Sequence, residues 1–182
     1  MSDNTSLDVQ TTQKQAVLQA RAKALAVEKV SSESDEDYLE VVEFRMGEEN
    51  YAFASTYIRE VYPVKEITPL PCTPPFVLGI INLRGQILSV LDLRQLFGLP
   101  LTVNGPRDRV IVIGDHEMEL GVMVDEVVGV RTVPLADFHA LSAALESSRS
   151  DYIAGVTTAR LILLDAGRIL TDERIIIHEE VA

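Results

Sequence analysis

The stretch PFVLGIINLRGQILSVLDLRQL, from Pro75 to Leu96, decides the fold of this chain. Its two apolar runs, Val77 to Leu83 and Ile87 to Leu91, flank the polar turn Arg84-Gly85. A helical pattern opens at Asp92, directly after the second run. This order predicts a β-hairpin that leads into a short helix. An asparagine, an arginine and a glycine at the tip of a rigid hairpin suit the recognition of another macromolecule better than bond-making.

The same β pattern continues over the rest of the chain from Tyr38 onward. Short β-branched runs, separated by Gly, Pro, Asn and Asp, predict about ten strands. The runs lie at 38–46, 51–55, 60–67, 77–83, 86–92, 109–114, 118–133, 152–158 and 160–165. Short connecting helices are expected at 92–97, closed by Gly98, and at 135–145 and 172–180. The fold class is therefore mainly β.

An internal repeat indicates that the β fold is doubled. FVLGI, at 76–80, recurs as YIAGV, at 152–156, and each copy leads through a strand, a turn and a strand to an aspartate and a helix. The two aspartates are Asp92 and Asp165. Ala52-Phe53 likewise recurs as Gly121-Val122. Chance similarity between apolar strands is the alternative. Two similar small barrels explain the repeat better, because one such barrel alone buries too little surface to be stable.

The charge and composition exclude several functions. A net charge of −12 and an isoelectric point near 4.6 would repel a phosphate backbone, so nucleic acid is not an expected partner. No apolar run reaches the roughly 18 residues of a membrane span, so direct membrane insertion is not expected. The N-terminus MSDNTSLDVQ does not resemble a signal peptide, and the single Cys72 cannot form an internal disulfide. We therefore expect a soluble protein of the cytoplasm.

The first 37 residues differ from the body in composition. They contain three of the four lysines, a helical pattern at 13–29 and the acidic run SSESDED at 31–37. We expect a flexible N-terminal extension at 1–37, with a helix and an acidic linker, followed by one folded domain at 38–182. The helix is either a tail without a specific role or a docking helix for a partner.

The sequence contains no recognisable catalytic residue, cofactor site or metal site. The three histidines lie in separate segments, and His116-Glu117 lacks the second histidine of a zinc-protease motif. Cys72 is expected to be a bystander thiol. The carboxylate pairs Asp125-Glu126 and Glu179-Glu180 are expected to be solvated charges. The sequence therefore does not predict an enzyme.

Five blocks in order resemble one known family. They are YAFASTYIREV (51–61), PPFVLGIINLRG (74–85), LDLR (91–94), GVMVDEVVGV (121–130), and YIAGV followed by LILLD (152–165). Together they resemble the CheW-like domain of chemotaxis coupling proteins. The resemblance implies two tandem five-stranded SH3-like β-barrel subdomains and no catalysis. It also implies an adaptor that links the cytoplasmic tips of chemoreceptors to the regulatory domain of the histidine kinase CheA in membrane-associated arrays. Because that regulatory domain is itself CheW-like, other CheW-like proteins are further partners that the resemblance suggests.

The resemblance also implies roles for individual residues. Ile58 and Glu60 match receptor-contacting positions, and the N-L-R-G tip is expected to join them in receptor binding. The tip residues are Asn82, Leu83, Arg84 and Gly85. The alternatives are that Ile58 belongs to the core and that Arg84 locks its own hairpin to an aspartate such as Asp92. Three further residues are expected to be structural or partner-facing: Gly79, Asp92 and Arg94.

Other functions stay open at this point. The chain could serve a chemosensory pathway with a non-flagellar output such as pili, and Ser55-Thr56-Tyr57, where the family is more aliphatic, leaves the receptor class undecided. A fragment of a CheA-type kinase is less favoured, because no phospho-acceptor histidine helix or ATP site is recognisable. A sugar- or peptide-binding β-barrel would need an aromatic groove, which a chain without tryptophan hardly predicts.

Overall fold

A computed structural model describes residues 37–101, 107–140 and 149–175. The expected N-terminal helix, most of the acidic linker, and His178, Glu179 and Glu180 lie outside these residues. No helix in the described ranges is long and apolar enough to cross a bilayer.

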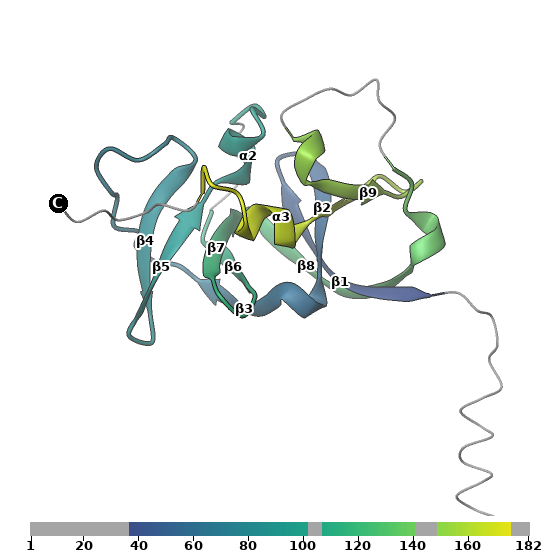
Figure 1. Ribbon diagram of the computed structural model, residues 1–182, viewed down its shortest axis with the longest axis horizontal. Helices are drawn as coiled ribbons and strands as arrows, with labels where there is room; N and C mark the ends of the chain where they lie inside the picture. Colours follow the sequence, from purple (N-terminus) through teal and green to yellow (C-terminus); the bar gives the residue numbers. More distant parts are fainter. Residues whose placement is uncertain (1–36, 102–106, 141–148, 176–182) are drawn as a thin grey trace, which may run out of the picture. The chain divides into compact units, whose positions relative to one another are not determined.

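Ten strands and two short helices make up the described domain (Figure 1). The strands are β1 (Tyr38–Met46), β2 (Glu49–Ala54), β3 (Ile58–Pro63), β4 (Val77–Leu83), β5 (Gln86–Leu91), β6 (Arg109–Gly114), β7 (Glu119–Val124), β8 (Glu126–Pro134), β9 (Ile153–Val156) and β10 (Leu161–Leu164). The helices are α2 (Leu93–Leu96) and α3 (Ala166–Leu170). The strands form two five-stranded sheets, which confirms the mainly β fold class.

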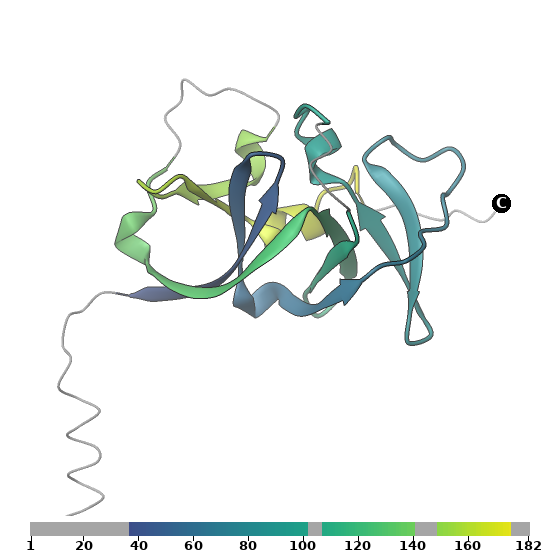
Figure 2. The ribbon, with the colours of Figure 1, turned by 180° about the vertical axis from the view of Figure 1, so that it is seen from behind.

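The distribution of the strands between the two sheets was not predicted from the sequence. The first sheet has the order β8-β1-β2-β10-β9, and the second has the order β3-β6-β7-β5-β4. The second sheet is continuous in sequence and is inserted between β2 and β8 of the first, so the two are nested rather than tandem. Figure 2 shows β8 running beside β1, its partner in the first sheet.

The internal repeat is visible in this topology. Strands β1 to β5 correspond to β6 to β10, and α2 corresponds to α3, so each sheet order can be converted into the other by this replacement. The one parallel pairing of each sheet, β2 with β10 and β7 with β5, follows the same rule. In each copy an aspartate, Asp92 or Asp165, caps the helix by accepting a hydrogen bond from a backbone N–H of its first turn.

Several expected elements have different bounds in the structure. The run expected at 118–133 is two strands, β7 and β8, separated at Asp125. The strand expected at 60–67 begins earlier and ends at Pro63. The helix expected at 135–145 is wrong over its described part, because only a single 3-10 turn, η2 (Leu135–Asp137), forms before a β-bridge at His139. The helix expected from Asp172 is also wrong as far as Ile175, because the helical turns come earlier, in α3, and residues 173–175 form a turn.

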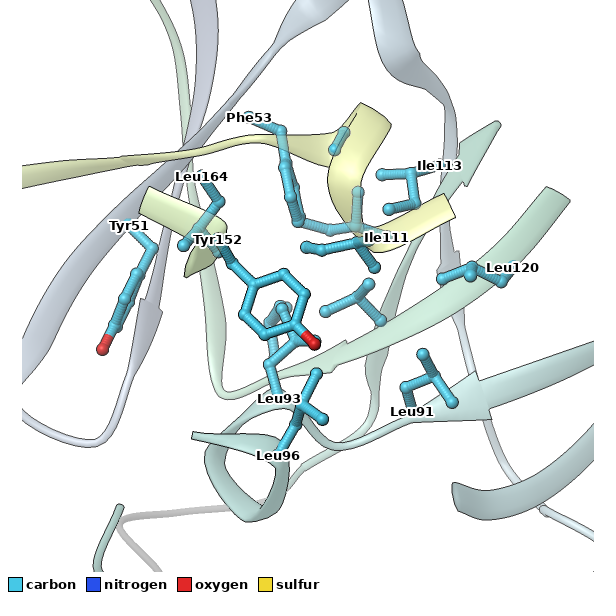
Figure 3. Packing of buried hydrophobic residues seen from close by; sticks show 14 of the residues in the cluster. Tyr51, Phe53, Leu91, Leu93, Leu96, Ile111, Ile113, Leu120, Tyr152 and Leu164 are labelled. Atoms are coloured by element: carbon cyan, nitrogen blue, oxygen red, sulfur yellow. The ribbon is translucent and has the colours of Figure 1, made fainter. Parts of the chain in front are cut away.

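The main hydrophobic core lies between the two sheets and is shared by them (Figure 3). The first sheet contributes Tyr51, Phe53 and Leu164, and the second contributes Leu91, Ile111 and Leu120. Both short helices bury their apolar side chains in the same cluster. Each sheet also curls around a smaller core of its own. Most of the apolar burial that stabilises the fold therefore joins the sheets rather than filling each one.

Candidate partner-binding surface

The β4–β5 turn presents the N-L-R-G tip in a two-residue hairpin turn. Arg84 and Gly85 both have positive φ angles, 54° and 90°, as a type I′ turn requires. The Asn82 side chain accepts a hydrogen bond from the Gly85 N–H at 2.8 Å, which fixes the turn. The structure thus confirms that backbone geometry requires Gly85. Leu83 is 7% exposed and its side chain lies in the second sheet's own core, so it does not face a partner.

The Arg84 guanidinium lies against the carboxylate of Glu60, which the sequence had placed in the same site. Arg84 Nη2 is 2.9 Å from Glu60 Oε2. Strands β3 and β4 are the two edge strands of the second sheet. Glu60 lies on β3 and Arg84 lies in the turn that follows β4, so the ion pair connects the two edges of the sheet. The suggested lock between Arg84 and Asp92 does not form, because Asp92 is buried with other arginines. The side chains of Arg84 and Glu60 are 79% and 27% exposed, so water screens the Arg84–Glu60 ion pair.

Ile58 and Glu60, the other two residues expected to bind a receptor, lie on strand β3, which pairs irregularly with β6. The register with β6 shifts between Ile58 and Glu60. Arg59, at this shift, donates a hydrogen bond from Nη2 to the Asp115 carbonyl at 2.8 Å. Ile58 is half-buried and packs against the shared core, so its side chain is only partly available to a partner.

An exposed isoleucine extends this surface and was not predicted from the sequence. Ile87 is 66% exposed and lies directly opposite Asn82 on the neighbouring strand. Paired residues of antiparallel strands project to the same face, so Ile87 lies beside the polar tip. We call Ile58, Glu60, Asn82, Arg84 and Ile87 the tip surface. It offers an apolar side chain and a charged pair, which suits macromolecular contact and contains no nucleophile.

Asp92 and Arg94 form part of a buried ionic network instead of a partner-facing site. Arg94 is 2% exposed, and its Nε lies 3.4 Å from Asp92 Oδ1. Arg107 places Nη1 2.8 Å from Asp92 Oδ2. Burial opposes ionisation of Asp92, but the hydrogen bonds and charges of Arg107 and Arg94 outweigh it and hold its pKa below the ordinary value. The capping role expected for Asp92 is confirmed.

Asp125 completes this network, and its expected solvation is wrong. Its side chain is 4% exposed, and Oδ1 lies 3.6 Å from Arg94 Nη1 and 3.2 Å from Arg107 Nε. Oδ2 accepts a hydrogen bond from the Gly47 N–H at 2.7 Å. A signal was present in the sequence, since Asp125 interrupts a long apolar run where a solvated charge would be out of place. Glu126, its neighbour, is exposed and pairs with Arg45.

Gly79 is required by close packing. Its φ is +140°, and a Cβ added there would lie 2.1 Å from the carbonyl oxygen of Thr68. The backbone of Thr68 forms a two-hydrogen-bond bridge with Ile80, which covers the outer side of β4. The structural alternative for Gly79 is therefore confirmed. In the described residues, no cluster of three or more acidic, histidine or cysteine side chains is arranged to bind a metal.

Comparison with known proteins supports the resemblance seen in the sequence. The family model described as the CheW-like domain matches residues 40–174. The chain is 26% identical over 148 residues to the chemotaxis protein CheW of Treponema pallidum, covering 78% of this chain and 87% of that protein. It is 37% identical over 94 residues to protein FrzA of Myxococcus xanthus, covering 52% of this chain and 59% of FrzA. The crystal structure of the scaffolding protein TtCheW from Thermoanaerobacter tengcongensis matches with a TM-score of 0.67 and 25% identity, covering 76% of this chain and 96% of that one.

Proposed function

This chain belongs to the CheW-like domain family and is a CheW-type adaptor, and on that premise we propose that it couples chemoreceptors to the histidine kinase CheA without catalysing a reaction. In this proposal it works in the cytoplasm at membrane-associated receptor arrays. One surface binds a receptor tip, and another binds the CheW-like regulatory domain of the kinase. Because arrays repeat both contacts, each contact needs only a modest affinity.

The observation that supports a receptor site at the tip surface is the exposed pair Arg84–Glu60 beside an exposed isoleucine. A receptor helix could place an aliphatic side chain on Ile87 and Ile58 while its polar groups reach Arg84. The guanidinium keeps donors free when it shares only one nitrogen with Glu60, so it can bind a second acceptor at the same time. We propose that Ile58, Glu60, Asn82, Arg84 and Gly85 form this receptor site, Gly85 through its backbone turn.

The test is a titration of the full chain with a receptor tip and, separately, with a CheA regulatory domain from the same cell. Arg84→Glu and Ile58→Asp should weaken receptor binding at least about tenfold, a loss typical of a central interface residue. The circular dichroism of Arg84→Glu should remain native, because an exposed ion pair contributes only about 0.2–1 kcal/mol. Ile58 packs against the shared core, so a loss of binding by Ile58→Asp counts only if its circular dichroism is also native. Arg160→Glu is the matched control. Arg160 has the same left-handed conformation, with φ 63°, at the equivalent point of the β9–β10 turn.

Exchanging the charges of Glu60 and Arg84 tests whether the receptor contacts Arg84 directly or only needs the ion pair to hold the surface in place. Glu60→Arg combined with Arg84→Glu rebuilds an ion pair of opposite direction across the same edges. If the receptor touches Arg84 directly, the double variant still binds weakly. Recovery of normal binding by the swap, or normal binding by both single variants, would show that the tip surface is not the receptor site.

A second candidate function is an adaptor of a chemosensory pathway with a non-flagellar output. It is favoured by the likeness to FrzA, a relative that does not carry the CheW name. The same titration distinguishes the two candidates when it is repeated with receptor tips from each pathway of the cell, because the cognate receptor should bind more tightly.

A further inference from the structure

The two halves of the domain cannot form their sheets separately. The first half, residues 38–96, holds β1 to β5 and α2, and the second half, residues 109–175, holds β6 to β10 and α3. Pairing within the first half is limited to the hairpins β1·β2 and β4·β5, and within the second to β6·β7 and β9·β10. The other four pairings, β1·β8, β2·β10, β3·β6 and β5·β7, join the two halves. Isolated two-stranded hairpins are marginal in water, so each half depends on the other.

The shared core shows the same dependence. Phe53, Leu91 and Leu93 belong to the first half, and they pack in one cluster with Ile111, Leu120 and Leu164 of the second (Figure 3). Neither half contains enough of this cluster to bury its own apolar surface. Sheets and core therefore form one interface between two complementary pieces of chain.

A single connection, residues 97–108, keeps the two pieces in one molecule. A connection of twelve residues can span at most about 40 Å, and residues 102–106 of it lie outside the described part. Arg107 fastens this connection by reaching Asp92 of the first half and Asp125 of the second. The fastening is imperfect, since Nη2 of Arg107 is buried without a hydrogen-bond partner among the described residues, and Nε lies 3.2 Å from Asp125 Oδ1 as an ion pair without forming a hydrogen bond.

From these observations we propose that the chain forms an intertwined dimer, in which the first half of each copy completes its sheets with the second half of the other. The eight strand pairings and the core are the same in the dimer as in the monomer. Only the path of the connection differs, so no strand contact is lost by the exchange. The second copy contributes β6 beneath the tip surface, because β3 pairs with β6 across the two halves.

Concentration sets the balance between the two forms. A short connection gives the two halves of one chain an effective concentration of about 1 mM for each other. Refolding far below this concentration should give monomers, and refolding near it should give a substantial dimer fraction. The exchanged dimer should then persist on dilution, because separating it requires the strands to unpair.

The experiment unfolds the full chain in denaturant and refolds it at about 1 mM and at a concentration about a hundredfold lower. Size-exclusion chromatography with light scattering then measures the mass of both samples after dilution to the same concentration. We expect dimer only from the concentrated sample. Arg107→Gln should raise the dimer fraction severalfold, because it releases the connection. Arg109→Gln, a change of the same kind at an exposed position of β6, should leave the fraction unchanged.

Two cysteine pairs distinguish exchange from ordinary association, both in a Cys72→Ser background. Arg45 lies opposite Glu126 of the other half and opposite Asn50 of its own half. Opposite residues of antiparallel strands lie about 4.5–5.5 Å apart at Cα, within the range of a disulfide. After oxidation of the dimer, Arg45→Cys with Glu126→Cys should give covalently linked pairs of chains on a non-reducing denaturing gel. Arg45→Cys with Asn50→Cys should give single chains.

Two results would overturn the proposal. One is the absence of dimer after refolding at about 1 mM. The other is a dimer in which the cysteines at 45 and 126 link only within single chains, because such a dimer would be held by surface contacts.

Discussion

Removal of the Asp92 charge should destabilise the domain strongly. Asp92→Asn keeps an oxygen that can cap α2, but it leaves Arg94 and Arg107 with Asp125 as the remaining carboxylate of the network. Breaking a buried ion pair from one side costs about 3–5 kcal/mol, and the remaining carboxylate favours the lower end. A loss of about 3 kcal/mol lowers the melting temperature of a chain of this size by about 6–12 °C.

The internal repeat supplies a matched control for this prediction. Asp165 caps α3 as Asp92 caps α2, but its side chain is 35% exposed and its partner Arg168 is 63% exposed. Asp165→Asn should therefore cost less than about 1 kcal/mol, as for other exposed pairs. Urea unfolding followed by circular dichroism measures both variants. The reasoning fails if the two variants lose the same stability, or if Asp92→Asn costs less than about 1 kcal/mol.

The pH dependence of the same variant gives an independent check. Because the folded-state pKa of Asp92 is lowered from 3.8, its charge stabilises the fold above that pH, and this contribution disappears as the pH falls through the lowered value. The difference in unfolding free energy between the natural chain and Asp92→Asn should be constant near neutrality and should close in acid. A difference that widens in acid would show that the carboxylate is not held ionised by its arginines.

Two further predictions concern packing and the C-terminal turn. Gly79→Ala should lower the free energy of unfolding by about 3 kcal/mol or more. Gly155→Ala, at the equivalent point of the repeat, places its Cβ 3.1 Å from the nearest atom and should lower it by only about 1 kcal/mol. Urea unfolding measures both variants, and equal losses would contradict this reasoning. The Arg174 side chain donates hydrogen bonds to Asp172 and, with the Tyr152 hydroxyl, lowers the pKa of Asp172 to about 2. Asp172→Asn should therefore reduce stability above the ordinary carboxyl pKa and lose its effect as the pH approaches 2, which unfolding measurements across that range would reveal.

Local pattern was sufficient to predict the strands, the tip and the doubling. β-Branched residues and turn residues locate most strands to within a few positions, although β7 and β8 were expected as one run, and the Arg84-Gly85 pair identifies its turn. The nesting of the sheets could not be read in this way. It depends on pairings such as Val90 with Gly121 and Leu163 with Ala52, between strands far apart in sequence whose composition would suit many partners.

The candidate site was predicted less completely, for a related reason. Arg84 and Glu60 were placed in one site by family resemblance, but their direct pairing and the exposure of Ile87 depend on how two edges of a sheet meet. Arg107 was missed because it lies in a connection without strand or helix pattern. Asp125 was expected to be solvated like Glu126, but it is the residue between β7 and β8, and its burial depends on Arg94 and Arg107 from other parts of the chain.

The core shared by the two sheets determines how the molecule unfolds. Since neither sheet keeps its main apolar contacts when the other melts, we expect unfolding to be all-or-none, with a single calorimetric peak despite the two barrels. A protease would then meet either the intact molecule or the open chain, and no half-degraded product that keeps one folded sheet would accumulate.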